Sequence, residues 1–165
     1  MSIARTGHAE VVVDASPEAV WPVVSDVTRT GDWSAECHRV RWLGDTTAAA
    51  PGARFRGRNR NRNGLIRWSR TCEVTSVAPP RELVWRTLPT PLYPDSTEWR
   101  ITLEPAGDGT RIVQTYQVTK MPGWFEAIVS RTMPAHSDRN TALAADLARL
   151  GAIVASTREQ SRPRA

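Results

Sequence analysis

The stretch RFRGRNRNRNG, residues 54–64, places an arginine at every second position. Two interpretations fit this spacing: a disordered arginine-rich segment, or one face of a β-strand, in which successive side chains point to opposite sides. Asn63-Gly64 favours the strand, because this dipeptide is a strong signal for a two-residue type I′ hairpin turn. We therefore expect the stretch to pair with the segment LIRWSRTCEV that follows it, residues 65–74.

Counting outward from that turn predicts how the two strands pair. The predicted pairs are 55 with 72, 57 with 70, 59 with 68, 60 with 67 and 62 with 65. The residues predicted to share the inner face are Phe55, Gly57, Asn59, Asn61, Ile66, Trp68, Arg70, Cys72 and Val74. The arginines of the repeat then lie on the outer face. Toward the turn the inner face changes from apolar to polar and aromatic, which indicates a cavity with a dry floor and a polar upper wall.

A second hairpin is predicted at Asp108-Gly109, another dipeptide typical of two-residue turns. The same counting places residue 103 opposite 114, 101 opposite 116 and 99 opposite 118. The predicted inner face is mainly apolar and carries two isolated polar groups, Gln114 and the Tyr116 hydroxyl. This hairpin therefore supports the same cavity.

The chain before these hairpins indicates a strand followed by two short helices. HAEVVVDAS, residues 8–16, is rich in β-branched residues. Ser16 is a plausible N-cap and Pro17 suits the first helical position, while Pro22 should keep that helix short. In ECHRVRWLG, residues 36–44, strict alternation predicts one face that carries Glu36, His38, Val40 and Trp42.

The last third of the chain has helical spacing. Apolar residues recur at steps of four, three and four, at Leu143, Leu147, Leu150 and Val154. These positions form one stripe of an amphipathic helix. Extended backward, the stripe reaches Asn140 and His136, where the helix would pass over the polar end of the sheet. Pro134 should separate this helix from a preceding one in PGWFEAIVSR, residues 122–131.

Composition limits the class of protein. At 165 residues the chain is expected to form one domain, residues 1–156, followed by a flexible polar tail, residues 157–165. The formal charge is +5, carried almost entirely by arginine, since Lys120 is the only lysine. Cys37 and Cys72 have neither metal-ligand nor redox spacing, so we expect no metal and no cofactor. The sequence has neither a secretory signal nor a transmembrane run, and a cytoplasmic protein is expected.

The order of elements and several motifs resemble the START-like (SRPBCC) superfamily, and within it the bacterial polyketide cyclase/dehydrase and lipid-transport group. The resemblance rests on SPEAVW (16–21), SDVTRTGDW (25–33), GARFRGRNR (52–60), CEVTSVAPPREL (72–83) and LEPAGDGTRI (103–112). It implies an α+β helix-grip fold: a curved antiparallel sheet wrapped around a long C-terminal helix, with two short helices after the first strand. It also implies an elongated cavity for an apolar ligand, but it supplies no catalytic residue.

The candidate ligand-binding residues are the inward side chains near the polar end of the sheet. They are Arg70, Asn59, Trp68, Trp99, Gln114, Tyr116, His136 and Asn140. Arg70 is the first candidate, because an inward guanidinium needs a ligand, water or a carboxylate. It could anchor a carboxylate or carbonyl oxygen of a ligand, or it could form a structural ion pair, for which Glu36 is one candidate. For Asn61 we favour a role in the turn, and for Asn59 a place in the cavity.

The sequence leaves catalysis open and assigns no catalytic residue. His136 is the best candidate for proton transfer, because histidine titrates near neutral pH, and Tyr116 is a second. His38 is an outside candidate. In an enzyme of the cyclase or dehydratase kind, Arg70 would polarise a carbonyl while His136 or Tyr116 carried a proton.

The predicted function is binding of a small hydrophobic or aromatic ligand, lipid-like or polyketide-like, in this internal cavity. The alternative is a polyketide cyclase or dehydratase that uses the same cavity. A third interpretation is binding of an anionic surface, such as a membrane surface, or of RNA through the outer arginines. Nucleic acid is disfavoured, because aromatic residues fall mostly on the inner face and leave no stacking platform. The sequence does not predict an oligomeric state.

Overall fold

The computed structural model describes residues 2–61 and 64–161, and within them the chain forms a seven-stranded sheet. Every pair of neighbouring strands is antiparallel, in the order β1-β7-β6-β5-β4-β3-β2. The strands are β1 (Thr6–Val13), β2 (Cys37–Trp42), β3 (Arg54–Arg60), β4 (Arg67–Ala78), β5 (Glu82–Thr87), β6 (Ser96–Ala106) and β7 (Gly109–Lys120). The helices are α1 (Pro17–Ser25), η1 (Val27–Arg29), α2 (Thr30–Trp33), α3 (Gly123–Thr132), η2 (Pro134–Ser137) and α4 (Asn140–Ser161).

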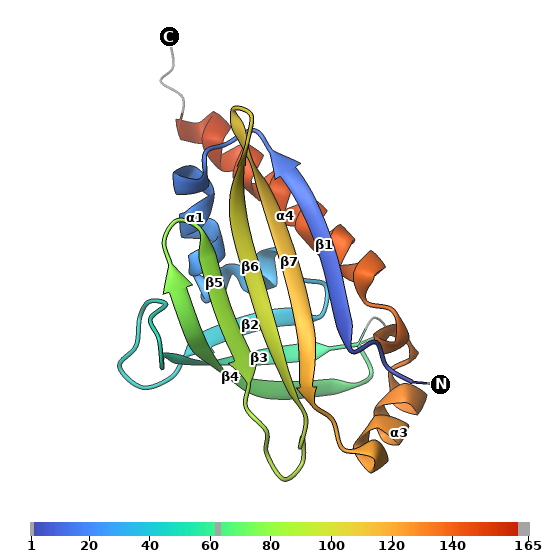
Figure 1. Ribbon diagram of the computed structural model, residues 1–165. Helices are drawn as coiled ribbons and strands as arrows, with labels where there is room; N and C mark the ends of the chain where they lie inside the picture. The colour runs from blue at the N-terminus through green and yellow to red at the C-terminus, as the bar shows by residue number, and fades with distance from the viewer. Residues whose placement is uncertain (1, 62–63, 162–165) are drawn as a thin grey trace.

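The sheet is strongly curved, and the long helix α4 lies along one side of it (Figure 1). α1, η1 and α2 follow β1 directly, and α3 lies below the start of β1 near the N-terminus. This arrangement confirms the predicted helix-grip α+β fold. α4 continues to Ser161, beyond the predicted domain boundary at residue 156.

The register predicted for the arginine-rich hairpin is confirmed. β3 and β4 pair 55 with 72, 57 with 70, 59 with 68 and 60 with 67. The predicted turn falls partly on Asn63, which lies outside the described residues, as does the predicted pair that includes Arg62. Asn61 has the turn role expected of it: its Oδ1 accepts a hydrogen bond from Ile66 N, and its carbonyl accepts one from Gly64 N.

The register predicted for the second hairpin is wrong by two residues. β6 and β7 pair 103 with 112, 101 with 114 and 99 with 116. The turn is centred on Gly107 and Asp108, because Gly107 takes the positive φ of 60° that the first position of a type II′ turn requires. Gly109 lies in β7, where an added Cβ would come within 2.2 Å of Val13 O. A shift by two keeps every side chain on its predicted face.

The face predicted for His38 is also wrong. The pairing of β2 with β3 shifts between Cys37 and Arg39, so a β-bulge interrupts the strict alternation. His38 is therefore exposed, whereas Cys37 and Val40 point inward. One extra residue in a strand is enough to move a side chain to the other face.

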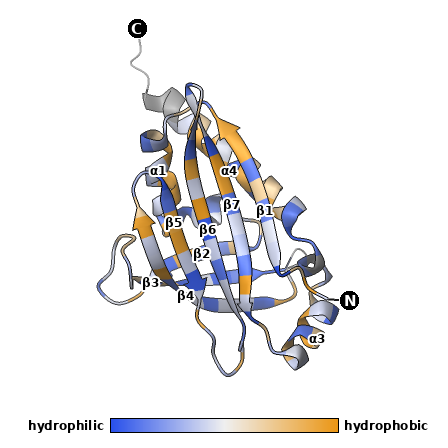
Figure 2. Ribbon diagram, viewed as in Figure 1, coloured by the Kyte–Doolittle hydropathy of each residue, from blue (hydrophilic) through white to orange (hydrophobic). Residues whose placement is uncertain are grey.

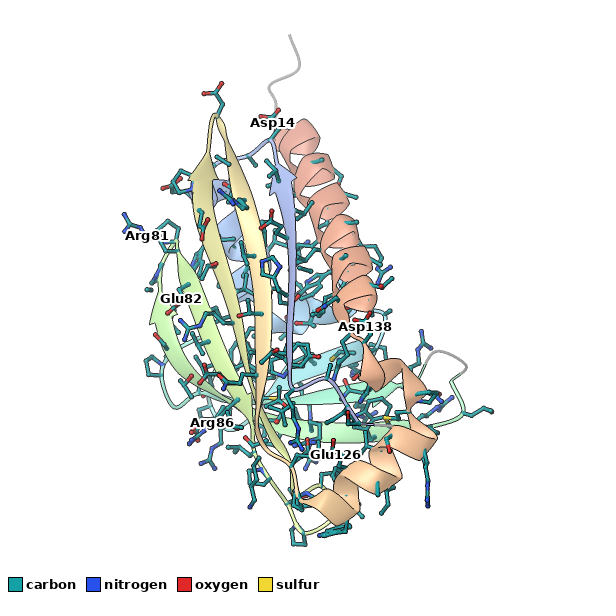
Figure 3. The ribbon with its side chains drawn as sticks, turned by 45° about the vertical axis from the view of Figure 1, so that its right-hand side comes forward. Asp14, Arg81, Glu82, Arg86, Glu126 and Asp138 are labelled. Atoms are coloured by element: carbon teal, nitrogen blue, oxygen red, sulfur yellow. The ribbon has the colours of Figure 1, made fainter. Side chains whose placement is uncertain are left out.

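Helix α1 begins where the sequence predicts, whereas the long helix α4 begins later than predicted. Ser16 Oγ accepts a hydrogen bond from Ala19 N and caps α1. α4 begins at Asn140, so the prediction that His136 continues its stripe is wrong: His136 lies in the separate turn η2. Asp138 breaks the helix with extended backbone, and its Oδ1 accepts a hydrogen bond from Asn140 N. Figure 3 shows Asp138 at this end of α4.

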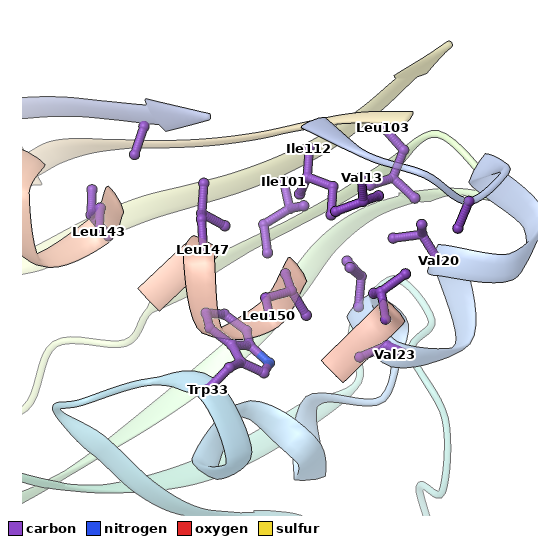
Figure 4. Packing of buried hydrophobic residues seen from close by; sticks show 14 of the residues in the cluster. Val13, Val20, Val23, Trp33, Ile101, Leu103, Ile112, Leu143, Leu147 and Leu150 are labelled. Carbon is purple, nitrogen blue, oxygen red and sulfur yellow. The ribbon is translucent and has the colours of Figure 1, made fainter. Parts of the chain in front are cut away.

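An aliphatic core fills the space between α4, α1 and the sheet (Figure 4). Its most buried members include Val20, Ile101, Ile112, Leu147 and Leu150, each at most 1% exposed. Burial of each such side chain stabilises the fold by about 1.5–3 kcal/mol. Along β6 and β7 hydrophobic and hydrophilic residues alternate, as Figure 2 shows, which leaves one face for this core and one for solvent. Among the helices of residues 2–61 and 64–161, none is long and apolar enough to cross a membrane.

Candidate ligand-binding cavity

Beyond the aliphatic core, the concave side of the sheet encloses a cavity of about 260 Å³. Its walls come from β2 to β7, from the short helices α1, η1, α2, α3 and η2, and from the first turns of α4. Among its lining residues are Phe55, Trp68, Trp85, Trp99, Tyr116 and Phe125. The wall is therefore rich in aromatic side chains.

Seven of the eight predicted ligand-binding residues line this cavity. They are Arg70, Asn59, Trp68, Trp99, Gln114, Tyr116 and His136. Asn140 does not line it, because its side chain turns toward β1, where Oδ1 accepts a hydrogen bond from His8 N. Gly57, which lies opposite Arg70, also lines the cavity, as the register predicts.

Stacked aromatic rings form one wall. Trp85 and Trp99 are nearly parallel, with ring centroids 6.3 Å apart, and Tyr116 lies 5.1 Å from Trp99. The guanidinium of Arg139 lies over both Trp99 and Tyr116, at 5.1 and 5.6 Å from their centroids. Cation–π contacts of this kind favour one orientation of the rings.

Close backbone packing at Gly7 makes room for Tyr116. An added Cβ at Gly7 would lie 2.1 Å from Tyr116 Cε1, so a larger residue would displace the ring. The hydroxyl of Tyr116 lies 3.5 Å from Ala4 O, to which it donates. Burial raises the pKa of this phenol, although the nearby Arg139 opposes the rise.

Arg70 forms the ion pair that the sequence left open, but its partner is Asp95 rather than Glu36. Nη1 donates to both carboxylate oxygens of Asp95, at 2.7 and 2.8 Å, and Nη2 donates to its carbonyl oxygen. Both side chains are about nine-tenths buried. The pair uses three of the five guanidinium N–H donors, so Nε and the second N–H of Nη2 remain for a ligand.

Glu36 instead anchors a second charged group on the wall. Its carboxylate accepts hydrogen bonds from Arg139 Nη2, at 3.2 and 3.3 Å, and lies 3.2 Å from His136 Nε2. Burial alone would raise the pKa of Glu36, but Arg139 and His136 outweigh it and lower that pKa to about 2. The His136 ring also contacts Trp68 edge to face, with centroids 6.4 Å apart. The imidazole is thus held in one orientation at the cavity wall.

Three buried side-chain polar atoms have no hydrogen-bond partner among the described residues, and all three belong to residues that line the cavity. They are Trp33 Nε1, Arg70 Nε and Gln114 Oε1. Gln114 is only 4% exposed. Buried polar atoms are nearly always paired, so a group of unpaired ones around one cavity indicates that a polar ligand or water completes them.

The two thiols do not suit nucleophilic chemistry. Burial raises the pKa of Cys37 to about 11 and that of Cys72 to about 12, so both stay protonated near neutral pH. Within the described parts of the chain, no three His, Cys, Asp or Glu side chains gather as a metal site would require.

The sequence missed three charged residues of the cavity. Asp95 is the last residue of the proline-rich loop PTPLYPD, residues 89–95, and Arg139 precedes the helical stripe, so neither belongs to a periodic pattern. Asp146 lies on α4 between the apolar positions 143 and 147, where it accepts a hydrogen bond from Ala35 N. Burial raises the pKa of Asp146. In the sequence, Asp146 is marked only by its position next to Leu147 of the apolar stripe.

Comparison with known proteins gives one family and many structural relatives. The family model described as "Polyketide cyclase / dehydrase and lipid transport" matches residues 5–150. No curated protein matches the chain. Protein CV1439 from Chromobacterium violaceum is 16% identical and has a TM-score of 0.65 over 91% of this chain and 96% of its own. Protein NE0264 from Nitrosomonas europaea is 15% identical, with a TM-score of 0.64 over 93% of this chain and 96% of its own.

A third similar structure is DynU16, a protein of the dynemicin biosynthetic locus. It is 17% identical, and the match covers 93% of this chain and 48% of DynU16, with a TM-score of 0.58. At such low identities, the likeness to all three structures shows a shared fold and nothing finer.

Proposed function

Because the chain belongs to the polyketide cyclase/dehydrase and lipid-transport family, we propose that its cavity binds a compact aromatic molecule that carries hydroxyl or carbonyl groups. The observation that carries this proposal is a set of three unpartnered buried atoms in residues that line the cavity, Trp33 Nε1, Arg70 Nε and Gln114 Oε1. Two of them are donors and one is an acceptor. A hydroxyl group can accept from the donors and donate to Gln114, whereas a hydrocarbon can do neither.

The size of the cavity limits the ligand to one or two rings. A cavity of about 150 Å³ accepts benzene, and pockets for drug-sized molecules have about 300–1,000 Å³. The cavity found here, about 260 Å³, falls between the two. This volume favours a one- or two-ring molecule over a long-chain lipid.

The chemistry of the wall favours a flat ligand. Trp68, Trp99 and Tyr116 offer ring faces and edges, which pack well against another aromatic ring. The charged groups on the wall are already paired, Arg70 with Asp95 and Glu36 with Arg139 and His136. A neutral oxygenated ring therefore suits this cavity better than a charged one.

Fluorescence titration with defined probes tests this proposal, because Trp85 and Trp99 lie beside the bound molecule. The probes are 2-naphthol, naphthalene and stearate. We expect 2-naphthol to bind about tenfold more tightly than naphthalene, since one hydrogen bond to a buried partner contributes about 1.4 kcal/mol. Stearate should bind weakest.

The variant Gln114→Leu should remove the preference for the hydroxyl, because leucine offers no acceptor. Gln117→Leu is the matched control: Gln117 is exposed on the same strand and should leave both affinities unchanged. If neither aromatic probe saturates the protein, or if stearate binds best, the proposal is wrong.

A second candidate function is proton transfer to or from the bound molecule, and the pairing of His136 with Glu36 favours it. Glu36 accepts the Nε2 proton of His136 in the neutral tautomer. The other ring nitrogen, Nδ1, is then unprotonated and can act as a general base. In this role His136 would remove a proton from a carbon next to a ketone and return it, while Glu36 positions the ring.

Deuterium exchange tests this second candidate. α-Tetralone, a two-ring ketone, is incubated with the protein in heavy water, and deuterium uptake next to its carbonyl is measured. General base catalysis should accelerate uptake by at least about 100-fold over buffer. His136→Gln should abolish the acceleration while 2-naphthol binding persists, and His8→Gln, at an exposed histidine of β1, should change neither. Uptake at the buffer rate would identify the protein as a binder without this activity.

A further inference from the structure

The outer face of the sheet carries a group of arginines that the cavity does not use. Arg39 lies directly opposite Arg58, Arg41 opposite Arg56, and Arg60 opposite Arg67. All six side chains are exposed. Within the described part of the chain, none of the six has a carboxylate oxygen within the 4.0 Å of an ion pair. Like charges placed opposite each other on a sheet are destabilising.

Four of these side chains surround a hollow on the surface. They are Arg39 and Arg41 from β2 and Arg56 and Arg58 from β3. Strands lie about 4.8 Å apart, and residues two apart along a strand are separated by about 6.7 Å. The backbone positions of the four residues therefore form a small rectangle. We call Arg39, Arg41, Arg56 and Arg58 the arginine grid.

The rest of the same outer face is built differently. Beyond the six arginines named above, arginines of this face pair with glutamates: Glu73 of β4 accepts from Arg54 of β3 and from Arg86 of β5, at 2.9 and 2.8 Å, and Glu82 accepts from Arg100. Arg111 lies 3.5 Å from Glu104. Figure 3 shows Glu82 and Arg86 on this side of β5. The other part of this face is therefore kept soluble by charges of both signs. Because solubility does not require arginines alone, it does not explain why the arginine grid lacks carboxylates.

Protection of a sheet edge explains only half of the grid. β2 is the last strand of the sheet, and charged residues on an edge strand prevent pairing with other chains. Arg39 and Arg41 fit this role. Arg56 and Arg58 do not, because β3 lies inside the sheet and is already paired on both sides.

We propose that the arginine grid is a binding site for a soluble oligophosphate, a short chain of phosphoryl groups. Guanidinium groups donate two parallel hydrogen bonds to phosphate oxygens, which a lysine ammonium cannot do. An anion with several charges close together would relieve the repulsion between Arg39 and Arg58 and between Arg41 and Arg56. The grid is far smaller than a nucleic-acid duplex, whose charges continue along its whole length.

Two larger anionic partners fit the face less well. The outward positions of β2 and β3 hold no Phe, Tyr or Trp, so the bases of a single strand would have no large ring to stack on. They also hold no apolar side chain that could enter a membrane. The strongly exposed apolar residues of α3, Trp124 and Ile128, belong to a different part of the molecule. A compact soluble anion is the partner that these observations favour.

Isothermal titration calorimetry of the full chain with tripolyphosphate tests this inference. Separate titrations with orthophosphate, with vesicles of phosphatidylglycerol and with a 20-base-pair DNA duplex provide the affinities for comparison. Tripolyphosphate should bind at least about tenfold more tightly than orthophosphate, because it makes additional charge-assisted hydrogen bonds. The affinity should fall as salt is added.

Two double variants with the same change in charge separate the site from general attraction. Arg56→Gln/Arg58→Gln should weaken tripolyphosphate binding by about 100-fold, or about tenfold for each arginine. Arg81→Gln/Arg111→Gln, at exposed positions away from the grid, should weaken it less than about twofold. Arg56→Lys/Arg58→Lys keeps the charge but loses the paired donors, so its affinity should lie between the two.

Four results would overturn the inference: no saturable heat with tripolyphosphate, equal losses in the two glutamine variants, or tighter binding to vesicles or to the duplex than to tripolyphosphate. Thermal denaturation of each variant checks that the fold is intact. Binding of 2-naphthol in the cavity is an independent readout, which the grid variants should not change.

Discussion

One part of the sheet packs Ile101 and Ile112 against Leu147 and Leu150 of α4, and each of these side chains is at most 1% exposed. Farther along the same sheet, rings and ion pairs replace the aliphatic side chains, and a cavity of about 260 Å³ remains. Branched aliphatic side chains can interlock to crystal-like density. Flat rings and fixed guanidinium–carboxylate pairs on a concave surface fill it less completely. One fold is therefore densely packed at one end and hollow at the other because different side chains occupy the two ends.

The two ends are also stabilised by different interactions. In the aliphatic core the gain comes from apolar area removed from water. Around the cavity it depends on partners, since a buried charge without its counter-charge is costly. Variants that remove one member of each kind of contact therefore test the comparison.

The largest effect is expected from Arg70→Met, at the cavity end. It leaves the buried Asp95 carboxylate without its partner, which should lower the free energy of unfolding by about 3–5 kcal/mol. Urea denaturation measures the change. Arg70→Met/Asp95→Leu should recover most of the loss, and Arg56→Met, at an exposed arginine of the neighbouring strand, should change stability by less than about 0.5 kcal/mol. If Arg70→Met alone were as stable as the wild type, the ion pair between Arg70 and Asp95 would not stabilise the cavity end of the fold.

In the aliphatic core, Leu147→Ala should lower the free energy of unfolding by about 2–5 kcal/mol, because Leu147 is fully buried and its removal leaves a new void. Leu92→Ala is the control, since Leu92 is 71% exposed. Equal denaturation midpoints for the two variants would contradict the closed packing described for this end.

Gly7→Ala tests the packing that places Tyr116 on the cavity wall. The added methyl group would overlap the Tyr116 ring, so we expect a loss of about 1–3 kcal/mol in the free energy of unfolding and weaker binding of 2-naphthol. Gly123→Ala is a matched change at a site where an added Cβ meets nothing within 4 Å. If the two variants behave alike in both measurements, the close approach at Gly7 has no role.

A smaller, pH-dependent effect is expected from Glu36. Its pKa in the folded protein, about 2, lies below its ordinary value of 4.5, so the unfolded chain binds the proton first as pH falls. Glu36 therefore stabilises the fold fully above about pH 4.5, and this contribution is lost as pH falls toward about 2. In Glu36→Gln the stability should decrease less between pH 6 and pH 3 than in the wild type. Denaturation curves with parallel pH dependence would refute the ion-pair account.

Much of the fold could be predicted because its signals are local. Alternation along residues 54–74 defined both faces of β3 and β4, and Ser16-Pro17 marked the start of α1. Local signals also limited the result. The bulge between Cys37 and Arg39 leaves no sign in the alternation, so the face predicted for His38 was wrong. Gly107-Asp108 and Asp108-Gly109 are both turn dipeptides, so the local signal did not decide the register of the second hairpin.

The candidate site could be predicted in part for the same reason. Inward side chains of regular strands, such as Trp68 and Gln114, followed from the alternation. The partners of the charged groups did not, because Asp95 and Arg139 reach the cavity from irregular segments whose course a periodic pattern does not define. Arg70 and Glu36 were both noticed in the sequence, but their true partners could be identified only from the three-dimensional arrangement.

A crystal structure of the chain with 2-naphthol would locate the bound molecule. We expect one molecule in the cavity, with its rings against Trp99 and Trp68 and its hydroxyl within hydrogen-bond distance of Gln114 Oε1. Side chains of Trp68, Trp85 or Trp99 filling the space instead, with 2-naphthol only on the surface, would contradict a ligand-binding cavity.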